Sequence, residues 1–324
     1  KPRVSIRKPE HRFDTQGEAP DAVRVERAMN SFVRDFGRTA AVYMESCIHC
    51  GMCAEACHFY EVTQDPKYTP IWKLEPFKQA YKREYGPFAF VYRALNLKPK
   101  VTVDELQQWH HLLYDSCTVC GRCSLMCPMG IDIASLGSQA RHGMFKAGLV
   151  PHELAAVTER ARREGSPLGA TPKVFADRCE WLSDEHDVEI TIDKPQAEVL
   201  CAMSSIEIMK YPESVVATAR IMRHVGADWT FRLDGYEATN FGLLTGDAAA
   251  QKELTLKIIH AAVACGAKVV VLPECGHAYT ALRWMGANIY GKPLPFRVMH
   301  IAEFLAEQVR AGKLRLRKVG KTAT

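Results

Sequence analysis

The two halves of the chain show different spacings of apolar residues. Between residues 103 and 114 the apolar positions recur with a helical period, and one face carries Leu106, Trp109, His110 and Leu113. The preceding segment, residues 70–97, is rich in aromatic residues and in Lys and Arg. We therefore expect a mainly helical domain over residues 41–150.

Strand and helix patterns alternate after residue 195. Short apolar runs predict strands over residues 198–203, 229–233, 268–272 and 296–299. Helical periods between and after them predict helices over residues 213–224, 248–265, 276–284 and 301–311. This alternation is typical of a parallel sheet covered on both faces. Residues 196–324 are thus predicted to be an α/β domain, which makes the fold class α+β multidomain.

Two further segments have neither pattern. Residues 1–40 are polar, with Pro, Arg and Lys throughout, and predict an extended or loosely ordered arm. Residues 151–195 predict a linker that holds one charged helix over residues 153–163 and a solvated acidic stretch over residues 183–187. The sequence Glu164-Gly165-Ser166-Pro167 ends that helix.

Composition and charge exclude several classes of protein. The 324 residues are 47% hydrophobic and 24% charged, with a net charge of +5, which is ordinary for a soluble globular protein. The sequence lacks the pattern of aromatic and basic residues that would indicate nucleic-acid binding. The most apolar stretch, residues 258–272, is interrupted by His260 and Lys268, so no membrane span is predicted. The polar start has no signal-peptide pattern. We expect a cytoplasmic protein, associated with a membrane only through a partner or through a segment upstream of Lys1.

The cysteines carry the chemistry. Eight of the twelve fall in two runs with the spacing C-x2-C-x2-C-x3-C and Gly after the second cysteine. This spacing is typical of [4Fe–4S] cluster ligands. The second run repeats the first at a distance of 70 residues, as Cys117 follows Cys47. The first run is Cys47, Cys50, Cys53 and Cys57, and the second is Cys117, Cys120, Cys123 and Cys127.

Loop geometry indicates how the eight thiolates divide. Three cysteines in a tight loop can reach three corners of one cube, and the Gly lets backbone N–H groups approach the inorganic sulfurs. The fourth cysteine lies on the following helix and tends to ligate the neighbouring cube. We therefore predict two [4Fe–4S] clusters with crossed ligation. Cys47, Cys50, Cys53 and Cys127 would hold one, and Cys57, Cys117, Cys120 and Cys123 the other.

Other readings of these cysteines explain less. A zinc site takes four ligands and would leave the third cysteine of each triplet unexplained. A disulfide framework is not expected without a secretion signal. His49 is predicted to line a cluster pocket rather than to bind iron. Arg122 is either a cation that raises a cluster potential or a solvated surface residue.

Further residues have open interpretations. Cys179 is predicted to be an ordinary thiol. Tyr81, Tyr85, Phe88, Phe90 and Tyr92 are predicted to belong to a core or an interface. A basic group is interpreted either as a docking face for an acidic flavoprotein or as a solvated face; it consists of Lys73, Lys78, Lys82 and Arg83.

Three motifs together resemble a known superfamily. They are the paired cysteine runs, Cys57-His-Phe-Tyr60 with Asp65-Pro-Lys-Tyr-Thr-Pro70, and Pro273-Glu-Cys-Gly-His-Ala-Tyr279. This combination resembles the superfamily of the heterodisulfide reductase D subunit. That group includes the K subunit of the sulfite-reductase-associated complex and the iron–sulfur subunits of glycolate and glycerol-3-phosphate dehydrogenases. It also includes oxidoreductases linked to dimethylglycine and electron-transfer flavoprotein. The resemblance covers about residues 40–324 and implies a cysteine-rich CCG-type domain at the C-terminal end.

The CCG motif is incomplete in this chain. Cys201 and Cys275 match two of its five cysteines, whereas Thr239, Asn240 and Ala278 occupy the other positions. By this resemblance, the repeat would not hold a noncubane cluster by itself. Cys275 and His277 remain candidate catalytic residues, because they follow a strand at the end where open α/β sheets bind ligands. Residues 314–324 resemble the lead-in to a second repeat.

The leading hypothesis is an electron-transfer subunit of an oxidoreductase. It would relay electrons through two [4Fe–4S] clusters between a flavoprotein or dehydrogenase and a quinone, a membrane b-type cytochrome or another acceptor. The alternative is a catalytic subunit of heterodisulfide or thiol–disulfide reduction, which needs a noncubane cluster from a further C-terminal repeat. A third interpretation is a scaffold that the clusters only stabilise. This interpretation does not explain why there are two adjacent cysteine runs.

Overall fold

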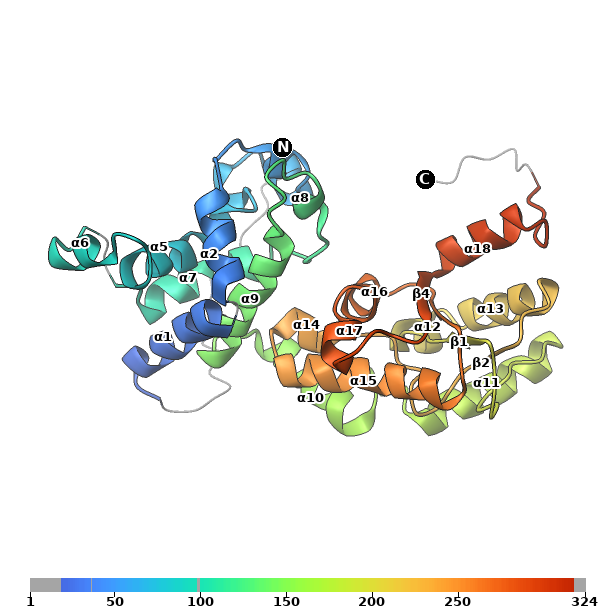
Figure 1. The fold of residues 1–324 in the computed structure, drawn as a ribbon. Helices are drawn as coiled ribbons and strands as arrows, with labels where there is room; N and C mark the ends of the chain where they lie inside the picture. Colours follow the sequence, from blue (N-terminus) through green and yellow to red (C-terminus); the bar gives the residue numbers. More distant parts are fainter. Residues whose placement is uncertain (1–18, 36, 98–99, 318–324) are drawn as a thin grey trace. The chain divides into compact units, whose positions relative to one another are not determined.

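The computed structural model describes residues 19–35, 37–97 and 100–317 (Figure 1). The chain forms two compact units. Unit 1 comprises the chain through Ala156 together with Gly242–Ala248. Unit 2 comprises Val157–Phe241 and the chain from Ala249 onward.

The regular secondary structure in the described part of unit 1 is helical. Its elements are α1 (Asp21–Asn30), the π-helix η1 (Ser31–Asp35), α2 (Gly37–Ser46), α3 (Met52–Glu55), α4 (His58–Thr63), the 3-10 turns η2 (Pro66–Tyr68) and η3 (Trp72–Leu74), α5 (Glu75–Glu84), α6 (Ala89–Ala94), α7 (Val103–Leu113), α8 (Arg122–Leu125), α9 (Ile133–Lys146) and most of α14 (Phe241–Thr245). The predicted helix over residues 103–114 is confirmed by α7, which Thr102 caps by accepting a hydrogen bond from the Glu105 backbone N–H.

Helices α1 and α9 pack closely in the core of unit 1. Gly143 on α9 allows this approach, because a Cβ atom there would lie 2.8 Å from the Ala28 carbonyl oxygen. Phe32 and Phe77 pack against each other beside it, with ring centroids 4.8 Å apart and ring planes tilted by 40°. Arg24 donates from Nε to the Ala147 carbonyl at 2.9 Å, at the C-terminal end of α9. A cation is favoured at this end, where backbone carbonyls lack helical partners.

The predicted N-terminal arm needs correction. Residues 21–30 form α1, and Ala28 and Phe32 are fully buried in the core. The polar composition misled the prediction because an amphipathic helix needs few apolar residues to bury one face. The first 18 residues of the arm lie outside the described residues.

Arg141 on α9 donates hydrogen bonds to backbone carbonyls of two other segments of unit 1. Its Nη1 donates to the Leu244 carbonyl at 2.9 Å and its Nε to the Leu113 carbonyl at 3.0 Å. The Tyr114 hydroxyl donates to the Thr245 carbonyl at 3.0 Å. These bonds fix residues 242–248 within unit 1, far in sequence from the other elements.

Unit 2 is an α/β domain. Helix α10 (His152–Glu164) leads into it, and its elements are α11 (Pro172–His186), β1 (Val199–Cys201), α12 (Ser205–Lys210), α13 (Glu213–His224), β2 (Trp229–Thr230), α15 (Ala248–Ala264), β3 (Val269–Leu272), α16 (Gly276–Arg283), α17 (Gly286–Tyr290), β4 (Arg297–His300) and α18 (Ile301–Arg310). The four strands form one parallel sheet in the order β2-β1-β3-β4. The predicted α+β multidomain class, with a helical part and a parallel-sheet part, is confirmed.

Successive strand residues face opposite sides of this sheet. Val199 and Cys201 join a core with α11 and α13, whereas Leu200 and Ala202 join a core with α15 and α16. Both faces are therefore apolar, as expected when helices cover a parallel sheet on both sides.

Two predictions for unit 2 were inaccurate. The linker contains the regular helix α11, which buries Phe175, Cys179 and Leu182. The strand predicted over residues 229–233 pairs with β1 only at Trp229 and Thr230, and Phe231 then bridges to Ile192. The linker thus contributes to both the core and the edge of the sheet.

No helix in the described ranges is both long and apolar enough to cross a membrane.

Gly246 offers a test of the packing in unit 1. Its φ is +84°, and an added Cβ would lie 2.3 Å from the Arg141 carbonyl oxygen. Gly37 has a φ of +55° with open space around its Cβ position, so it is a matched control. We predict that Gly246→Ala lowers the free energy of unfolding by about 1–3 kcal/mol more than Gly37→Ala, because the methyl group would displace buried backbone. Anaerobic chemical denaturation measures both, and equal losses would contradict the packing described.

Candidate functional site

The two cysteine runs fold into equivalent loops. His49 and Gly51 flank Cys50 with φ of 56° and 82°, and Val119 and Gly121 flank Cys120 with φ of 53° and 79°. Each Gly then starts a single-turn helix, α3 or α8. A positive φ is unusual for a β-branched residue such as Val119. The shared left-handed geometry therefore indicates a local conformation imposed by the function of the loop.

The first pocket gathers four thiols from both runs. It is lined by Cys47, Cys50, Cys53 and Cys127. Ile71, Ile131 and Ile133 supply apolar walls, and His49 lines the same pocket. The last cysteine of the second run thus lies with the first three of the first run.

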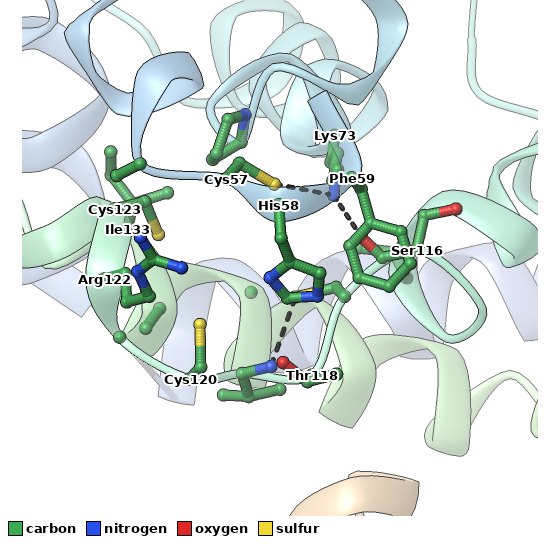
Figure 2. Close-up of a pocket in the computed structure, with 18 of the residues that line it drawn as sticks. Cys57, His58, Phe59, Lys73, Ser116, Thr118, Cys120, Arg122, Cys123 and Ile133 are labelled. Carbon is green, nitrogen blue, oxygen red and sulfur yellow. Dashed lines mark hydrogen bonds between the residues drawn. The ribbon is translucent and has the colours of Figure 1, made fainter. Parts of the chain in front are cut away.

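The second pocket gathers the other four thiols of the runs. It is lined by Cys57, Cys117, Cys120 and Cys123. Figure 2 shows this pocket, with Cys57 approaching from one side and Cys120 and Cys123 from the loop and helix of the second run. The Val119 backbone N–H donates to Cys117 Sγ at 3.4 Å. Arg122 and His58 also line the pocket.

Burial makes the innermost thiols hard to ionise. It raises the pKa of Cys123 to about 12, with smaller contributions from Cys117, Cys120 and other thiols nearby. Burial also raises the pKa of Cys53, although a hydrogen bond from the Ile71 backbone opposes this. Iron binding requires thiolates, so a metal centre must offset this cost.

Each pocket has a buried lysine nearby: Lys73 lines the second pocket, and Lys78 contacts His49, which lines the first. Lys73 lines the second pocket, is 4% exposed, and its Nζ lies 3.8 Å from Cys57 Sγ. It also donates to the Ser116 carbonyl and lies over the Phe59 ring at 5.1 Å. Figure 2 shows Lys73 between the Cys57 sulfur and Ser116. At the first pocket, Lys78 Nζ lies 2.9 Å from Nε2 of His49.

Both interpretations of the basic group, as a docking face and as a solvated face, are therefore wrong. Lys73, Lys78 and Arg83 are buried, and of the four residues only Lys82 is partly exposed. Sequence reasoning treated these cations as surface groups because lysine and arginine are rarely buried. The burial of Lys73 could have been expected from its apolar sequence neighbours, Ile71, Trp72 and Leu74.

These residues fit iron–sulfur clusters. Among the described residues, no three His, Cys, Asp or Glu side chains are grouped so as to hold a single metal ion. A cube takes one thiolate at each of four irons, so its ligands stand further apart than those of zinc. Buried cations are costly without a nearby negative charge, and a thiolate-bound cube supplies one.

The two cysteines of unit 2 that match the CCG motif lie in different hydrophobic clusters. Cys201 is fully buried in the core with α11 and α13, whereas Cys275 belongs to the core on the opposite face. Burial raises the pKa of both thiols. Cys275 Sγ caps α16 by accepting a hydrogen bond from the Ala278 N–H, and His277 follows in the first turn.

Cys179 and the aromatic residues of unit 1 differ in burial. Cys179 is buried in the core of unit 2, where burial raises its pKa to about 12. Of the aromatic group in unit 1, Tyr81 joins the core, whereas Tyr85, Phe88 and Phe90 are exposed.

Comparison with known proteins agrees with this site. Residues 43–131, which contain both runs, match the family model of the 4Fe-4S dicluster domain. The Hdr-like menaquinol oxidoreductase iron-sulfur subunit 2 of Archaeoglobus fulgidus is 28% identical over 254 residues, which cover 75% of this chain and 45% of that protein. The D subunit of the dihydromethanophenazine:CoB–CoM heterodisulfide reductase of Methanosarcina mazei is 27% identical, over 87% of this chain and 67% of that protein.

These relatives support the resemblance of the chain to the superfamily of the heterodisulfide reductase D subunit. The EtfAB:quinone oxidoreductase of Syntrophomonas wolfei is a further relative, 25% identical over 87% of this chain and 42% of that protein. The chain spans about half the length of the Archaeoglobus relatives, with 45% covered. No solved structure matches the chain. The match to the dicluster domain supports the binding of iron–sulfur clusters by residues 43–131.

Double substitutions test how the thiols are divided. If ligation is crossed, Cys57→Ser with Cys117→Ser removes two ligands of one cluster and leaves about four irons. Cys57→Ser with Cys50→Ser damages both clusters, so less than half of the iron should remain. Iron and acid-labile sulfide are measured on anaerobically purified protein. Retention of about four irons by the second variant, rather than the first, would show that each run holds its own cluster.

Proposed function

We propose that this chain is an electron-transfer subunit of an oxidoreductase complex, relaying single electrons through two [4Fe–4S] clusters. The observation that carries the proposal is the adjacency of the two pockets. Ile133 lines both, so one apolar side chain belongs to the walls of both four-thiol sets. Neighbouring redox centres of this kind suit electron transfer better than a purely structural role.

In this proposal each pocket provides one complete ligand set. Cys47, Cys50, Cys53 and Cys127 hold one cluster, and Cys57, Cys117, Cys120 and Cys123 hold the other. When bound, each cluster supplies a one-electron redox couple whose potential depends on charge, hydrogen bonds and burial. The isoleucines make part of the first pocket's lining apolar, and such surroundings influence a cluster's potential.

Each pocket has one exposed ligand through which electrons could enter or leave. Cys50 at the first pocket and Cys120 at the second are exposed, whereas Cys53 is buried. The names of the relatives indicate the kinds of exchange partner: a menaquinol oxidoreductase and an electron-transfer-flavoprotein:quinone oxidoreductase. We propose a flavoprotein and a membrane b-type cytochrome or quinone site as partners, with the chain on the cytoplasmic side.

The arrangement in unit 2 supports relay over disulfide reduction. Thr239, Asn240 and Ala278 stand at positions that carry cysteines in the CCG motif. Asn240 instead donates to Thr255 Oγ1 at 3.0 Å, in the buried interior of unit 2. Cys201 and Cys275 belong to the cores on opposite faces of the sheet, an arrangement that does not favour a shared dithiol site.

A redox titration followed by electron paramagnetic resonance tests the proposed relay. We predict that both clusters of the anaerobic protein undergo reversible one-electron reduction, and that their spectra in the fully reduced protein show magnetic interaction because the pockets share a wall. With a reduced dye as donor, the same preparation should not turn over a heterodisulfide. Clusters that cannot be reduced would refute the relay, and heterodisulfide turnover at full cluster loading would favour the catalytic alternative.

A further inference from the structure

The second pocket is flanked by a buried cation in direct contact with a ligand. Lys73 Nζ lies 3.8 Å from Cys57 Sγ, and the side chain is almost fully enclosed. Trp109 on α7 fixes the lysine backbone by donating from Nε1 to the Lys73 carbonyl at 2.9 Å. The cation thus has a fixed position beside one predicted cluster ligand.

A second buried cation, Arg141, contacts the backbone of Cys117, one of the cysteines that line this pocket. The Arg141 side chain is 2% exposed, and its Nη2 donates to the Cys117 carbonyl at 2.6 Å and to the Leu113 carbonyl at 2.7 Å. These acceptors are neutral carbonyls, and the guanidinium lies 5.0 Å from the Tyr114 ring centroid. Within the described part of the chain, neither Lys73 nor Arg141 forms an ion pair with a carboxylate. Both positive charges therefore act on the pocket without local neutralisation.

The first pocket has a weaker positive environment. Its lysine, Lys78, contacts His49 rather than a sulfur atom. The carboxylate of Glu75 acts on Lys78 more strongly than the nearby Lys82 cation does, and the carboxylate of Glu45 adds a smaller negative contribution. Their negative charges offset part of the field of this lysine.

We propose that the two clusters have unequal reduction potentials, and that the cluster held by Cys57, Cys117, Cys120 and Cys123 has the higher one because Lys73 and Arg141 stabilise its reduced form. This inference rests on the proposed two-cluster relay. A thiolate-bound cube gains one negative charge on reduction, so a fixed cation nearby favours the reduced state. The contact is stronger in a low-dielectric interior than in water. A single electron shared by the pair therefore resides mainly on the cluster of the second pocket.

Substitution of Lys73 tests this assignment in the cluster-loaded protein. Lys73→Gln removes the charge but keeps a hydrogen-bond donor, whereas Lys73→Arg keeps the charge. Lys82 lies one turn beyond Lys78 on α5 and lines neither pocket, so Lys82→Gln is the matched control. In a redox titration, Lys73→Gln should lower the equilibrium constant for the higher-potential step at least tenfold, or about 59 mV for one electron. Lys73→Arg should shift this step much less, and Lys82→Gln should leave this step unchanged.

A second measurement does not depend on how Lys73→Gln folds. The double variant Cys57→Ser with Cys117→Ser should keep only the cluster of the first pocket, and its single potential should match the lower step of the unsubstituted protein. A match to the upper step would overturn the inference. A fully loaded Lys73→Gln protein in which the upper step does not move would also overturn it. Both outcomes leave the two-cluster relay intact, whereas an unsubstituted protein without reducible clusters would refute the relay itself.

Discussion

The balance of charge inside unit 1 is the constraint on which its structure depends. Its interior contains thiols whose ionisation is opposed by burial, most strongly Cys123, together with the buried cations Lys73 and Arg141. Either set alone would be costly in an apolar core. A metal centre ligated by thiolates resolves both costs, because it favours ionised sulfur and provides negative charge opposite the cations. We infer that folding of unit 1 and cluster binding are thermodynamically linked.

The two runs are equivalent in backbone but not in surroundings. His49 and Val119 share the left-handed conformation, and Gly51 and Gly121 share the next one. Around this common loop the protein places a lysine–histidine contact on one side and a lysine–sulfur contact on the other. A repeated ligand motif can therefore give two centres with different properties, since the residues that distinguish them come from η3, α5 and α9 rather than from the motif.

Much of the fold could be predicted because its signals are local. The spacing of the cysteines, the helical period of α7 and the alternation of strands and helices in unit 2 are each contained in short stretches of sequence. The grouping of thiols in the two pockets follows the crossed pattern expected from the loop and helix geometry, and the ligand assignment itself stays a prediction.

Other features depend on tertiary context and could not be predicted. The burial of Lys73 and Lys78 follows from how α5 and η3 pack in unit 1, and a basic stretch in the sequence has the same composition whether it is buried or exposed. Arg141 contacts Leu244, 103 residues away, so no local pattern could reveal its role. Helices α1 and α11 were missed because their many charged residues concealed narrow apolar faces.

The central claim is that eight thiolates of unit 1 hold two iron–sulfur cubes. Its most direct test is the content of iron, acid-labile sulfide and zinc in the unsubstituted chain, purified without oxygen. The account predicts about eight irons and eight labile sulfides per polypeptide, with no stoichiometric zinc. About four irons, or zinc in place of iron, would contradict it.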